Sequence, residues 1–356
     1  MVPDSFIQDL KMKINIVDLV SSYTNLKKHG RNYIGLCPFH NEKTASFYLY
    51  PDSGSFYCFG CACGGDVITF AEKAEGLEYI DAVKFLAQRY GLSVPQDNLK
   101  DDYLLKLRMR IYEINRASAR FFYEKLYSKE GKDALLYLKG RGLSDGTIRR
   151  FGLGFSPSSR FELVNFLKSR GFSYEEIIQS NMALATKSGN AIDRFSSRVM
   201  FPIIDQRGNV IAFGGRSMDP NNKAKYLNTS DTPVFKKSNN LFALNFAKNQ
   251  KDENFILVEG YMDVIALNQA GFKNTVATLG TALTIDQARL MAKFKNEVIV
   301  CYDSDNAGQK AASRAIDILR SVDLLVKVLA VPKGKDPDEF IRSYGNQGYV
   351  RFKQLI

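Results

Sequence analysis

The sequence has no apolar run that approaches the roughly 20 residues a membrane-spanning helix needs. Its first twenty residues include acidic side chains and lack the basic start, apolar stretch and small-residue cleavage site of a secretory leader. It also lacks a GxxxxGK[ST] phosphate loop, which argues against a motor that runs on NTP hydrolysis. We therefore expect a soluble, cytoplasmic protein that is not such a motor.

A disulfide framework is also missing. The chain has five Cys, an odd number, and four of them lie between Cys37 and Cys63. Such a local cluster favours a metal site in a reducing compartment. Cys301 stands alone in an apolar strand pattern, where we expect it in the core. A length of 356 residues is enough for two or three domains with their own hydrophobic cores.

Positive charge is present in excess and is unevenly distributed. Lys and Arg number 49 against 38 Asp and Glu, a formal net charge of +11. Residues 139–237 hold 16 basic and 8 acidic side chains, which is +8 of that excess. A concentrated basic field favours a polyanionic partner, because binding phosphates releases counterions. A solvated basic surface explains the charge equally well, so the motifs must decide.

Hydrophobic spacing divides the chain into three parts. Helical spacing covers residues 6–21, a turn surrounds residues 29–31, and runs at 46–50 and 55–59 predict a hairpin. Two helical patterns follow at 67–74 and 79–90, then a polar linker at 91–102 that contains Pro95. A long amphipathic helix at 103–128, a helical pair at 131–151 and a mixed region come next. From Phe255 onward strands and helices alternate, which predicts a parallel sheet with helices on its faces.

Two pairs of potential metal ligands lie within the Cys-rich segment. Cys37 and His40 form one pair, Cys58 and Cys61 form the other, and seventeen residues separate the pairs. Two such turns bring four N and S donors into the tetrahedron that zinc prefers, and a closed set of this kind is structural. Cys63 could replace Cys61, but its spacing from Cys58 is less usual, so we expect a spare thiol.

The predicted hairpin is rich in aromatic rings. Alternation along its strands sends some rings into the core and others outward, where they could stack on unpaired bases. Core is the more frequent fate for any single ring. The rings are Phe47, Tyr48, Tyr50, Phe56, Tyr57 and Phe59. His29 has no partner visible in the sequence, and we assign it to the loop.

Acidic residues recur where the strands of the alternating region should end. They are Glu259 and Asp263 in VEGYMD, Asp303 and Asp305 in YDSDNAG, and Asp336 and Asp338 in GKDPDEF. The carboxyl ends of parallel strands form a common crevice, so acids from three segments can converge there. Carboxylates without His or Cys suit Mg²⁺ or Mn²⁺, which stabilise the charge of nucleotidyl transfer. Helix capping explains Asp263 or Asp305 alone equally well.

These motifs together resemble one known family. CPFHNEKTASF, FYCFGC, RFSSRVMFPIIDQRGNVIAFGGR, AKYLN, VEGYMDVIAL, YDSDNAG and DPDEF occur in the order found in bacterial DnaG-type DNA primases. The resemblance covers the chain from Ser5 onward. It implies an α+β multidomain fold: a zinc ribbon at residues 1–100, a basic α+β subdomain at 101–250, and a Toprim subdomain with a parallel α/β sheet at 251–356.

The resemblance also implies a reaction and its residues. The reaction is template-directed synthesis of short RNA on single-stranded DNA from ribonucleoside triphosphates at the replication fork, with one structural Zn²⁺ and catalytic Mg²⁺ or Mn²⁺. The six acids above are the implied metal ligands, with Glu259, Asp303 and Asp305 catalytic and Glu259 an acid or base. Rings at Phe195, Phe201, Phe213 and Tyr226 could interleave with the basic track. The basic residues implied for the template and nucleotide path are Arg141, Arg194, Arg198, Arg216, Lys225 and Lys237.

Some features depart from the family pattern or fit another class. Ser304 stands where the family usually has Gly, and Gly214 and Gly215 suit either a phosphate contact or a hairpin turn. Family members usually continue past position 356 into a domain that binds the replicative helicase, so we expect that helicase to stimulate this chain little. The rivals are a Toprim topoisomerase or nuclease, and a noncatalytic recombination mediator. The full acid set argues against the mediator, because negative charge does not help DNA binding.

Overall fold

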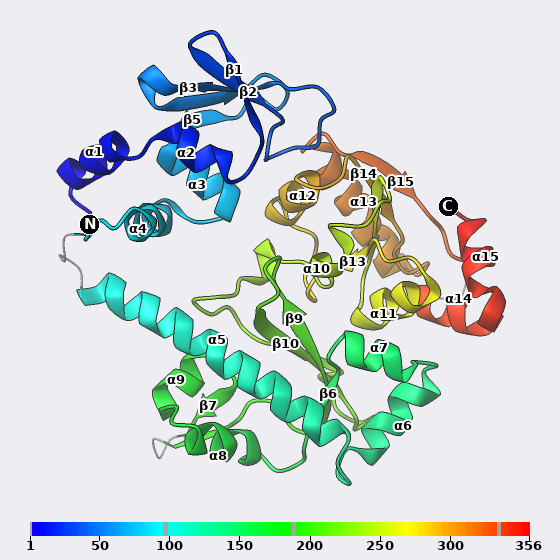
Figure 1. Ribbon diagram of the computed structural model, residues 1–356. Coiled ribbons are helices and arrows are strands. Elements are labelled where there is room, and N and C mark those ends of the chain that lie inside the picture. Colours follow the sequence, from blue (N-terminus) through cyan, green and yellow to red (C-terminus); the bar gives the residue numbers. More distant parts are fainter. Residues whose placement is uncertain (1, 95–98, 187–189, 333–335) are drawn as a thin grey trace. The chain divides into compact units, whose positions relative to one another are not determined.

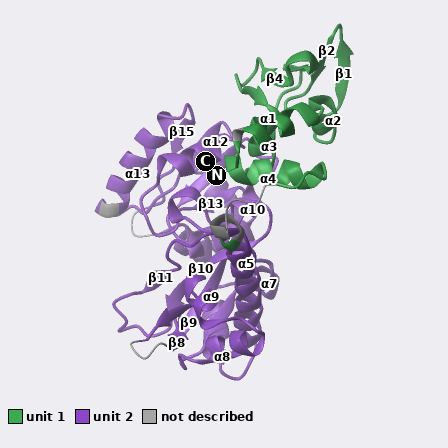
Figure 2. Ribbon diagram, turned by 90° about the vertical axis from the view of Figure 1, so that its left-hand side faces the viewer, with its two compact units in different colours: residues 1–103 green, residues 104–356 purple. Residues whose placement is uncertain are grey.

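In the computed structural model, residues 2–94, 99–186, 190–332 and 336–356 are described, and they form two compact units, residues 1–103 and 104–356 (Figure 2). Of the predicted linker, Pro95 and the three residues after it lie outside the described residues. None of the helices in the described part of the chain combines the length and apolar character that a bilayer crossing requires.

The smaller unit is a five-stranded antiparallel sheet with helices (Figure 1). Its strands lie in the sheet in the same order as in the sequence: β1 (Leu26–His29), β2 (Asn32–Gly35), β3 (Phe47–Tyr50), β4 (Ser55–Cys58) and β5 (Gly64–Asp66). Its helices are α1 (Asp4–Lys13), α2 (Ile16–Ser21), α3 (Val67–Glu75) and α4 (Tyr79–Arg89). The predicted hairpin is the β3 and β4 pair, in which Phe47 lies opposite Cys58. The predicted helical segment at 6–21 is two helices, because Asn15 caps a second one through Val17 N–H.

The larger unit begins with helices around an antiparallel sheet of order β11-β10-β9-β6 (Figure 1). Its helices are α5 (Leu99–Leu126), which starts before the unit boundary at residue 104, α6 (Lys132–Gly140), α7 (Asp145–Arg150), α8 (Glu162–Ser169) and α9 (Tyr174–Gln179). Its strands are β6 (Gly154–Ser156), β9 (Arg198–Ile204), β10 (Val210–Ser217) and β11 (Tyr226–Asn228), beside a separate pair, β7 (Ala183–Ala185) and β8 (Ala191–Asp193).

The alternating region forms the parallel sheet that the sequence predicts, in the order β13-β12-β14-β15. The strands are β12 (Asn254–Val258), β13 (Thr275–Ala277), β14 (Glu297–Val300) and β15 (Leu325–Val328). The helices are α10 (Leu244–Ala247), α11 (Tyr261–Ala270), α12 (Ile285–Ala292), α13 (Asn306–Arg320), α14 (Pro337–Tyr344) and α15 (Gly348–Lys353).

Both faces of this parallel sheet are covered, as the near-continuous apolar strands require. Successive side chains of β12 point to opposite faces, so Ile256 packs with residues of α11 and α14, and Leu257 packs with residues of α12 and α13. Cys301, directly after β14, is fully buried, which confirms its expected place in the core. The carboxyl ends of the strands therefore all meet at one edge, and that edge holds the predicted acids.

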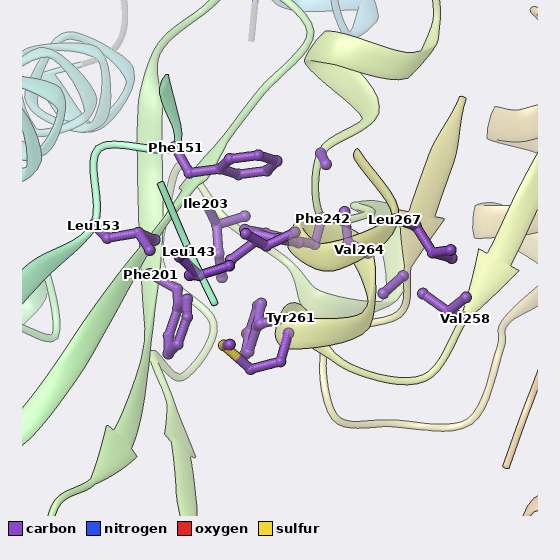
Figure 3. Close-up of a cluster of buried hydrophobic side chains, with 14 of the residues drawn as sticks. Leu143, Phe151, Leu153, Phe201, Ile203, Phe242, Val258, Tyr261, Val264 and Leu267 are labelled. Atoms are coloured by element: carbon purple, nitrogen blue, oxygen red, sulfur yellow. The ribbon is translucent and has the colours of Figure 1, made fainter. Parts of the chain in front are cut away.

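One core joins the antiparallel and parallel halves of the larger unit. Figure 3 shows Phe201 of β9 and Tyr261 of α11 side by side in it, with ring centroids 5.1 Å apart and stacked. Phe242 meets Tyr261 edge-on at 4.7 Å. Gly214 lies inside β10, where a Cβ would come within 2.5 Å of the Tyr261 ring. The phosphate contact or hairpin turn expected from the sequence is therefore wrong for Gly214. This residue lacks a side chain so that the Tyr261 ring can pack against β10.

Candidate functional site

Four donors meet in the smaller unit, beside the β3 and β4 hairpin. Cys37 follows β2, Cys58 ends β4, and the ligand atoms of Cys37, His40, Cys58 and Cys61 all lie within 4.8 Å of one another. The Cys37 and Cys61 sulfurs are 3.9 Å apart, and the Cys58 sulfur is 3.8 Å from His40 Nδ1. Zn–S bonds of about 2.3 Å in a tetrahedron give an S···S edge of about 3.8 Å. The set fits zinc, as predicted from the spacing.

Glu42 supports this set, although sequence reasoning did not single it out. One carboxylate oxygen of Glu42 lies 3.3 Å from His40 Nε2, the ring nitrogen that is turned away from Cys58. The other accepts hydrogen bonds from the backbone N–H groups of Cys37 at 2.7 Å and Ser46 at 3.2 Å. A carboxylate behind a metal-binding His fixes the orientation and tautomer of its ring. The only sequence signal is that Glu42 lies two residues after His40.

Replacing Glu42 with glutamine tests this support. The amide keeps the side-chain size but removes the charge that orients His40, so we expect zinc affinity to fall by about tenfold to a hundredfold. Competition with a chromophoric chelator would measure the loss. Glu78→Gln, an exposed position on the same unit, is the matched control and should keep wild-type affinity. Equal affinities for the two variants would remove Glu42 from the site.

The hairpin rings divide between core and surface, as the alternation predicts. Phe47 and Phe56 are buried and stacked at 5.3 Å. On the outer side Phe59 is 65% exposed and contacts Tyr48 and Tyr57 edge-on, at 5.4 Å and 4.9 Å. The expected loop role of His29 is wrong: it ends β1, and its ring lies 6.0 Å from Tyr48. We name Tyr48, Tyr57 and Phe59 the ring cluster.

In the larger unit, the loops after β12 and β14 bring Glu259 and Asp303 together. The Asp303 N–H donates a hydrogen bond to Glu259 Oε1 at 3.0 Å. Gly308, in the first turn of α13, allows this approach, because a Cβ there would lie 2.9 Å from Glu259 Oε1 and 2.3 Å from the Asp303 carbonyl oxygen. The motif YDSDNAG thus includes its glycine for close packing against the acids.

Asp263 and Asp338 join the same edge from α11 and α14. Asp263 is 8% exposed, and its two oxygens accept hydrogen bonds from Gly260 N–H at 3.1 Å and Asp338 N–H at 3.4 Å. The fully buried Asp338 carboxylate forms ion pairs with Arg141 of the α6 C-terminus and with Arg342 at 3.3 Å. Burying this charge is tolerable because two guanidinium groups neutralise it. Arg342 was missed, though its place four residues after Asp338 on a helix is a signal.

Asp305 and Asp336 are helix caps, the alternative that the sequence left open for Asp305. Asp305 Oδ1 accepts from Gly308 N–H at 2.7 Å at the start of α13, and Asp336 Oδ1 accepts from Glu339 N–H at 2.6 Å at the start of α14. Asp263 likewise caps α11 through Gly260. Each carboxylate oxygen has two lone pairs, so an oxygen that accepts one hydrogen bond can still bind a metal. Capping and metal binding are therefore compatible, and a metal role for these acids stays a prediction.

Burial and the charges of neighbouring acids raise the pKa of Asp303 and of Asp263. Burial, followed by the charges of Glu259, Asp336 and Asp305, raises the pKa of Asp303 to about 6. Burial, followed by the charges of Asp336 and Asp303, raises the pKa of Asp263 to about 8. Acids from all three motifs therefore interact, as the convergence of strand ends predicts. Hard oxygen donors under mutual repulsion fit a divalent cation, which relieves the repulsion when bound.

This repulsion predicts how stability depends on pH without metal. The pKa of Asp263 is about 8 in the folded chain and about 4 when unfolded, so folding favours its protonated form. That contribution is full below pH 4 and is lost as the pH rises through about 8. We expect Asp263→Asn to flatten the decline in unfolding free energy between pH 5 and pH 9, measured with urea in EDTA. Wild-type pH dependence in this variant would contradict the assignment. Asp317→Asn, on the exposed face of α13, is the control.

The predicted basic residues differ in their surroundings. Arg216 lies over the Tyr137 ring at 4.4 Å, and Arg141 is held by Asp338. Arg194 donates to the Asn228 carbonyl at 3.2 Å and the Ser230 hydroxyl at 3.1 Å. Lys225 is exposed and Lys237 half-buried. The role of these residues in binding template or nucleotide stays a prediction.

Arg198 and three of the predicted rings lie in the interior. Arg198 is 5% exposed and donates to the carbonyl oxygens of Gly215 and Ala224, at 3.1 Å and 3.0 Å. It joins β9 to β10 and to the loop before β11, so charge reversal there would test folding rather than phosphate binding. The expectation that rings interleave with the basic track is wrong for Phe195, Phe201 and Phe213, which are all fully buried. Tyr226 is 40% exposed and stays a candidate.

Fold and sites together define a class of protein: a zinc ribbon joined in sequence to a Toprim catalytic core. Three protein-family models match in that order: the CHC2 zinc finger over residues 2–102, the N-terminal domain of the DNA primase catalytic core over 121–248, and Toprim-like over 256–341. The chain belongs to the bacterial DnaG-type DNA primase family.

Individual relatives agree with this assignment. DNA primase of Clostridium acetobutylicum is 44% identical over 354 residues, covering 98% of this chain and 58% of the relative. DNA primase of Geobacillus stearothermophilus is 38% identical over 356 residues, with 98% and 59% covered. The crystal structure of the Aquifex aeolicus primase zinc-binding and RNA polymerase domains is 40% identical, with a TM-score of 0.64, and 98% of this chain and 85% of that chain are covered. The chain therefore spans somewhat over half the length of these curated relatives.

A second solved structure carries nucleic acid. The structure of the DnaG primase catalytic domain bound to ssDNA is 36% identical, with a TM-score of 0.64, and the match covers 71% of this chain and 83% of that chain. The CHC2 zinc-finger match supports zinc at the Cys and His set, and the Toprim-like and primase-core matches imply a divalent metal, whose ligands stay a prediction. Both agree with the donors described above.

Proposed function

We propose that this chain synthesises short RNA primers on single-stranded DNA from ribonucleoside triphosphates. One observation carries the proposal: Glu259, Asp303 and Asp263 gather at the carboxyl edge of the parallel sheet, where burial and neighbouring acids raise the pKa of Asp303 and of Asp263, in a chain that also holds a zinc ribbon. The rival mediator gains nothing from such a cluster, because negative charge repels DNA. We place the activity at the replication fork in the cytoplasm, and the replicative helicase stays a partner predicted from the resemblance.

The reaction joins a 3′-hydroxyl to the α-phosphorus of the incoming triphosphate. The new O–P bond forms as the α–β phosphoanhydride bond breaks, and the hydroxyl proton and pyrophosphate leave. Divalent metal at the acids supplies charge stabilisation for this transfer. Glu259, fixed by Asp303 N–H, is our candidate acceptor of the proton. The Asp338 carboxylate is engaged in ion pairs with Arg141 and Arg342. The main role of Asp338 is therefore to position Asp263, through the hydrogen bond from the Asp338 backbone N–H.

The predicted basic residues and the exposed aromatic rings bind the nucleic-acid strands. Arg216 of β10 is paired with Tyr226 of β11, which follows Lys225 in the chain, and an exposed ring near cations suits an unpaired base and its phosphate. Lys237 lies next to Ser238, whose carbonyl accepts from the Thr284 hydroxyl at 2.5 Å, so it stands near the start of α12, on the carboxyl side of β13. On the zinc ribbon, the ring cluster offers faces on which single-stranded template can stack.

Charge reversal at Lys237 tests the basic path. Lys237→Glu should weaken binding of single-stranded DNA or nucleotide and reduce the salt slope of the affected interaction by about 1. Lys251→Glu is the matched control, since Lys251 precedes β12 at the opposite edge of the sheet and is exposed. Binding measured by fluorescence anisotropy between 50 and 200 mM salt gives both quantities. Identical slopes for the two variants would make Lys237 ordinary surface.

The activity itself is tested with the purified chain, mixed single-stranded templates, labelled ribonucleotides and Mg²⁺ or Mn²⁺. Short RNA that requires template and metal is the expected product. Binding of the template without any RNA product would favour the mediator, and nicked or relaxed DNA would favour a nuclease or topoisomerase.

A further inference from the structure

The thiol of Cys63 lies at the zinc set, although the ligand spacing does not include it. Its sulfur is 3.1 Å from the sulfur of Cys61. The backbone holds it there, because Cys58 N–H donates a 2.8 Å hydrogen bond to the Cys63 carbonyl oxygen. Ala62, between the two thiols, has a φ of 54°, a left-handed conformation that non-glycine residues seldom adopt. The turn that carries Cys63 is therefore fixed to a ligand residue.

The distances show how the two thiols relate to a tetrahedron. The Cys37 to Cys61 distance of 3.9 Å and the Cys58 to His40 distance of 3.8 Å are close to the edges of a zinc tetrahedron, about 3.8 Å between sulfurs. The 3.1 Å between Cys61 and Cys63 is shorter than such an edge. The two sulfurs thus do not occupy two corners. They lie next to each other, with Cys61 exposed and Cys63 half-buried, and of the two only Cys61 belongs to the four donors whose ligand atoms all lie within 4.8 Å of one another.

We propose that Cys63 is an alternative zinc ligand, and that Cys61 and Cys63 exchange at one corner of the site. In the exchange the Zn–S bond to Cys61 breaks as the bond to Cys63 forms, and the proton of the Cys63 thiol passes to Cys61. One thiolate replaces another, so the charge and donor set stay unchanged. The ribbon then keeps its metal when the exposed Cys61 is alkylated. This goes beyond primer synthesis and does not depend on it.

Zinc retention in single and double variants of the full chain tests the proposal. We expect one zinc per chain in both Cys61→Ser and Cys63→Ser, with affinities within about tenfold of wild type in chelator competition. Cys61→Ser with Cys63→Ser together should lose zinc, as Cys58→Ser does. Loss of zinc from Cys61→Ser alone would overturn the proposal, and so would loss from Cys63→Ser alone. Either result would show that only one of the two thiols can bind zinc.

Cobalt substitution gives an independent readout. Co²⁺ reports its sulfur ligands through the intensity of the thiolate-to-metal charge-transfer band, and the proposal requires three thiolates in Cys61→Ser, as in wild type. A band of two-thiolate intensity in this variant would mean that Cys63 does not bind, and would overturn the proposal even if some metal were retained.

Discussion

Replacing Asp303 with alanine is expected to abolish primer synthesis while leaving the chain folded. Asp303 is half-buried at the carboxyl end of β14, next to Glu259, and it belongs to none of the hydrophobic clusters of the described residues. Its backbone N–H, which holds Glu259, remains in the variant. Removing one carboxylate from the metal-binding edge should lower the rate about a hundredfold or more, because charge stabilisation in the transition state is lost.

Stability distinguishes this loss from misfolding. The pKa of Asp303 is raised to about 6 by burial and by Glu259, Asp336 and Asp305, so its charge is under repulsion at neutral pH. In EDTA at pH 8, Asp303→Ala should melt at or above the wild-type temperature. The control is Asp317→Ala, an exposed acid on α13, which should keep full activity. Full primer yield from Asp303→Ala, or a clear drop in its melting temperature, would refute the role assigned to Asp303.

Removing a zinc ligand is expected to unfold the smaller unit alone. Cys58 is the last residue of β4 and is fully buried in a core that also contains Phe47, Phe56 and Phe70. Its replacement therefore removes the zinc and also the bond that fixes the end of β4 to the metal. Zinc binding in small ribbons contributes about 10–16 kcal/mol of folding free energy, which is more than a unit of this size can lose. The larger unit has its own cores and should stay folded.

Two measurements separate these outcomes for Cys58→Ala. Metal analysis should give no zinc, and hydrogen exchange should show loss of protection in residues 2–94 with native protection in β9, β12 and α11. Cys301→Ala is the control, because it removes a buried thiol from the parallel sheet and should keep one zinc. A zinc-free Cys58→Ala whose ribbon stays protected would show that the metal does not hold the fold.

The sequence was informative where local spacing determines geometry. Two short turns predict the zinc ligands, and strand-end acids predict a common edge, because both follow from a few neighbouring residues. Glu42 was not found in this way, because its contacts with Cys37, Ser46 and His40 depend on how the loop between β2 and β3 folds back on itself and follow no regular spacing. The burial of Phe201 could not be predicted from alternation along the strand. Both faces of β9 are covered, so neither the odd-numbered nor the even-numbered side chains face solvent. The strand at residues 26–29 has an exposed, polar pattern, and only its pairing with β2 defines it.

The stacked pair of Phe201 and Tyr261 has a consequence for how the larger unit can be divided. Tyr261 begins α11, the helix that carries Asp263, yet its ring is 5% exposed because β9 and β10 cover it. Residues 251–356 made on their own would present this ring and its apolar neighbours to water and would be prone to aggregate. The two halves of the larger unit should therefore unfold in a single cooperative transition, and a cleavage site engineered near residue 250 would leave them associated. In evolution, one half could be replaced by a different domain only if the replacement kept the apolar surface that packs against the other half.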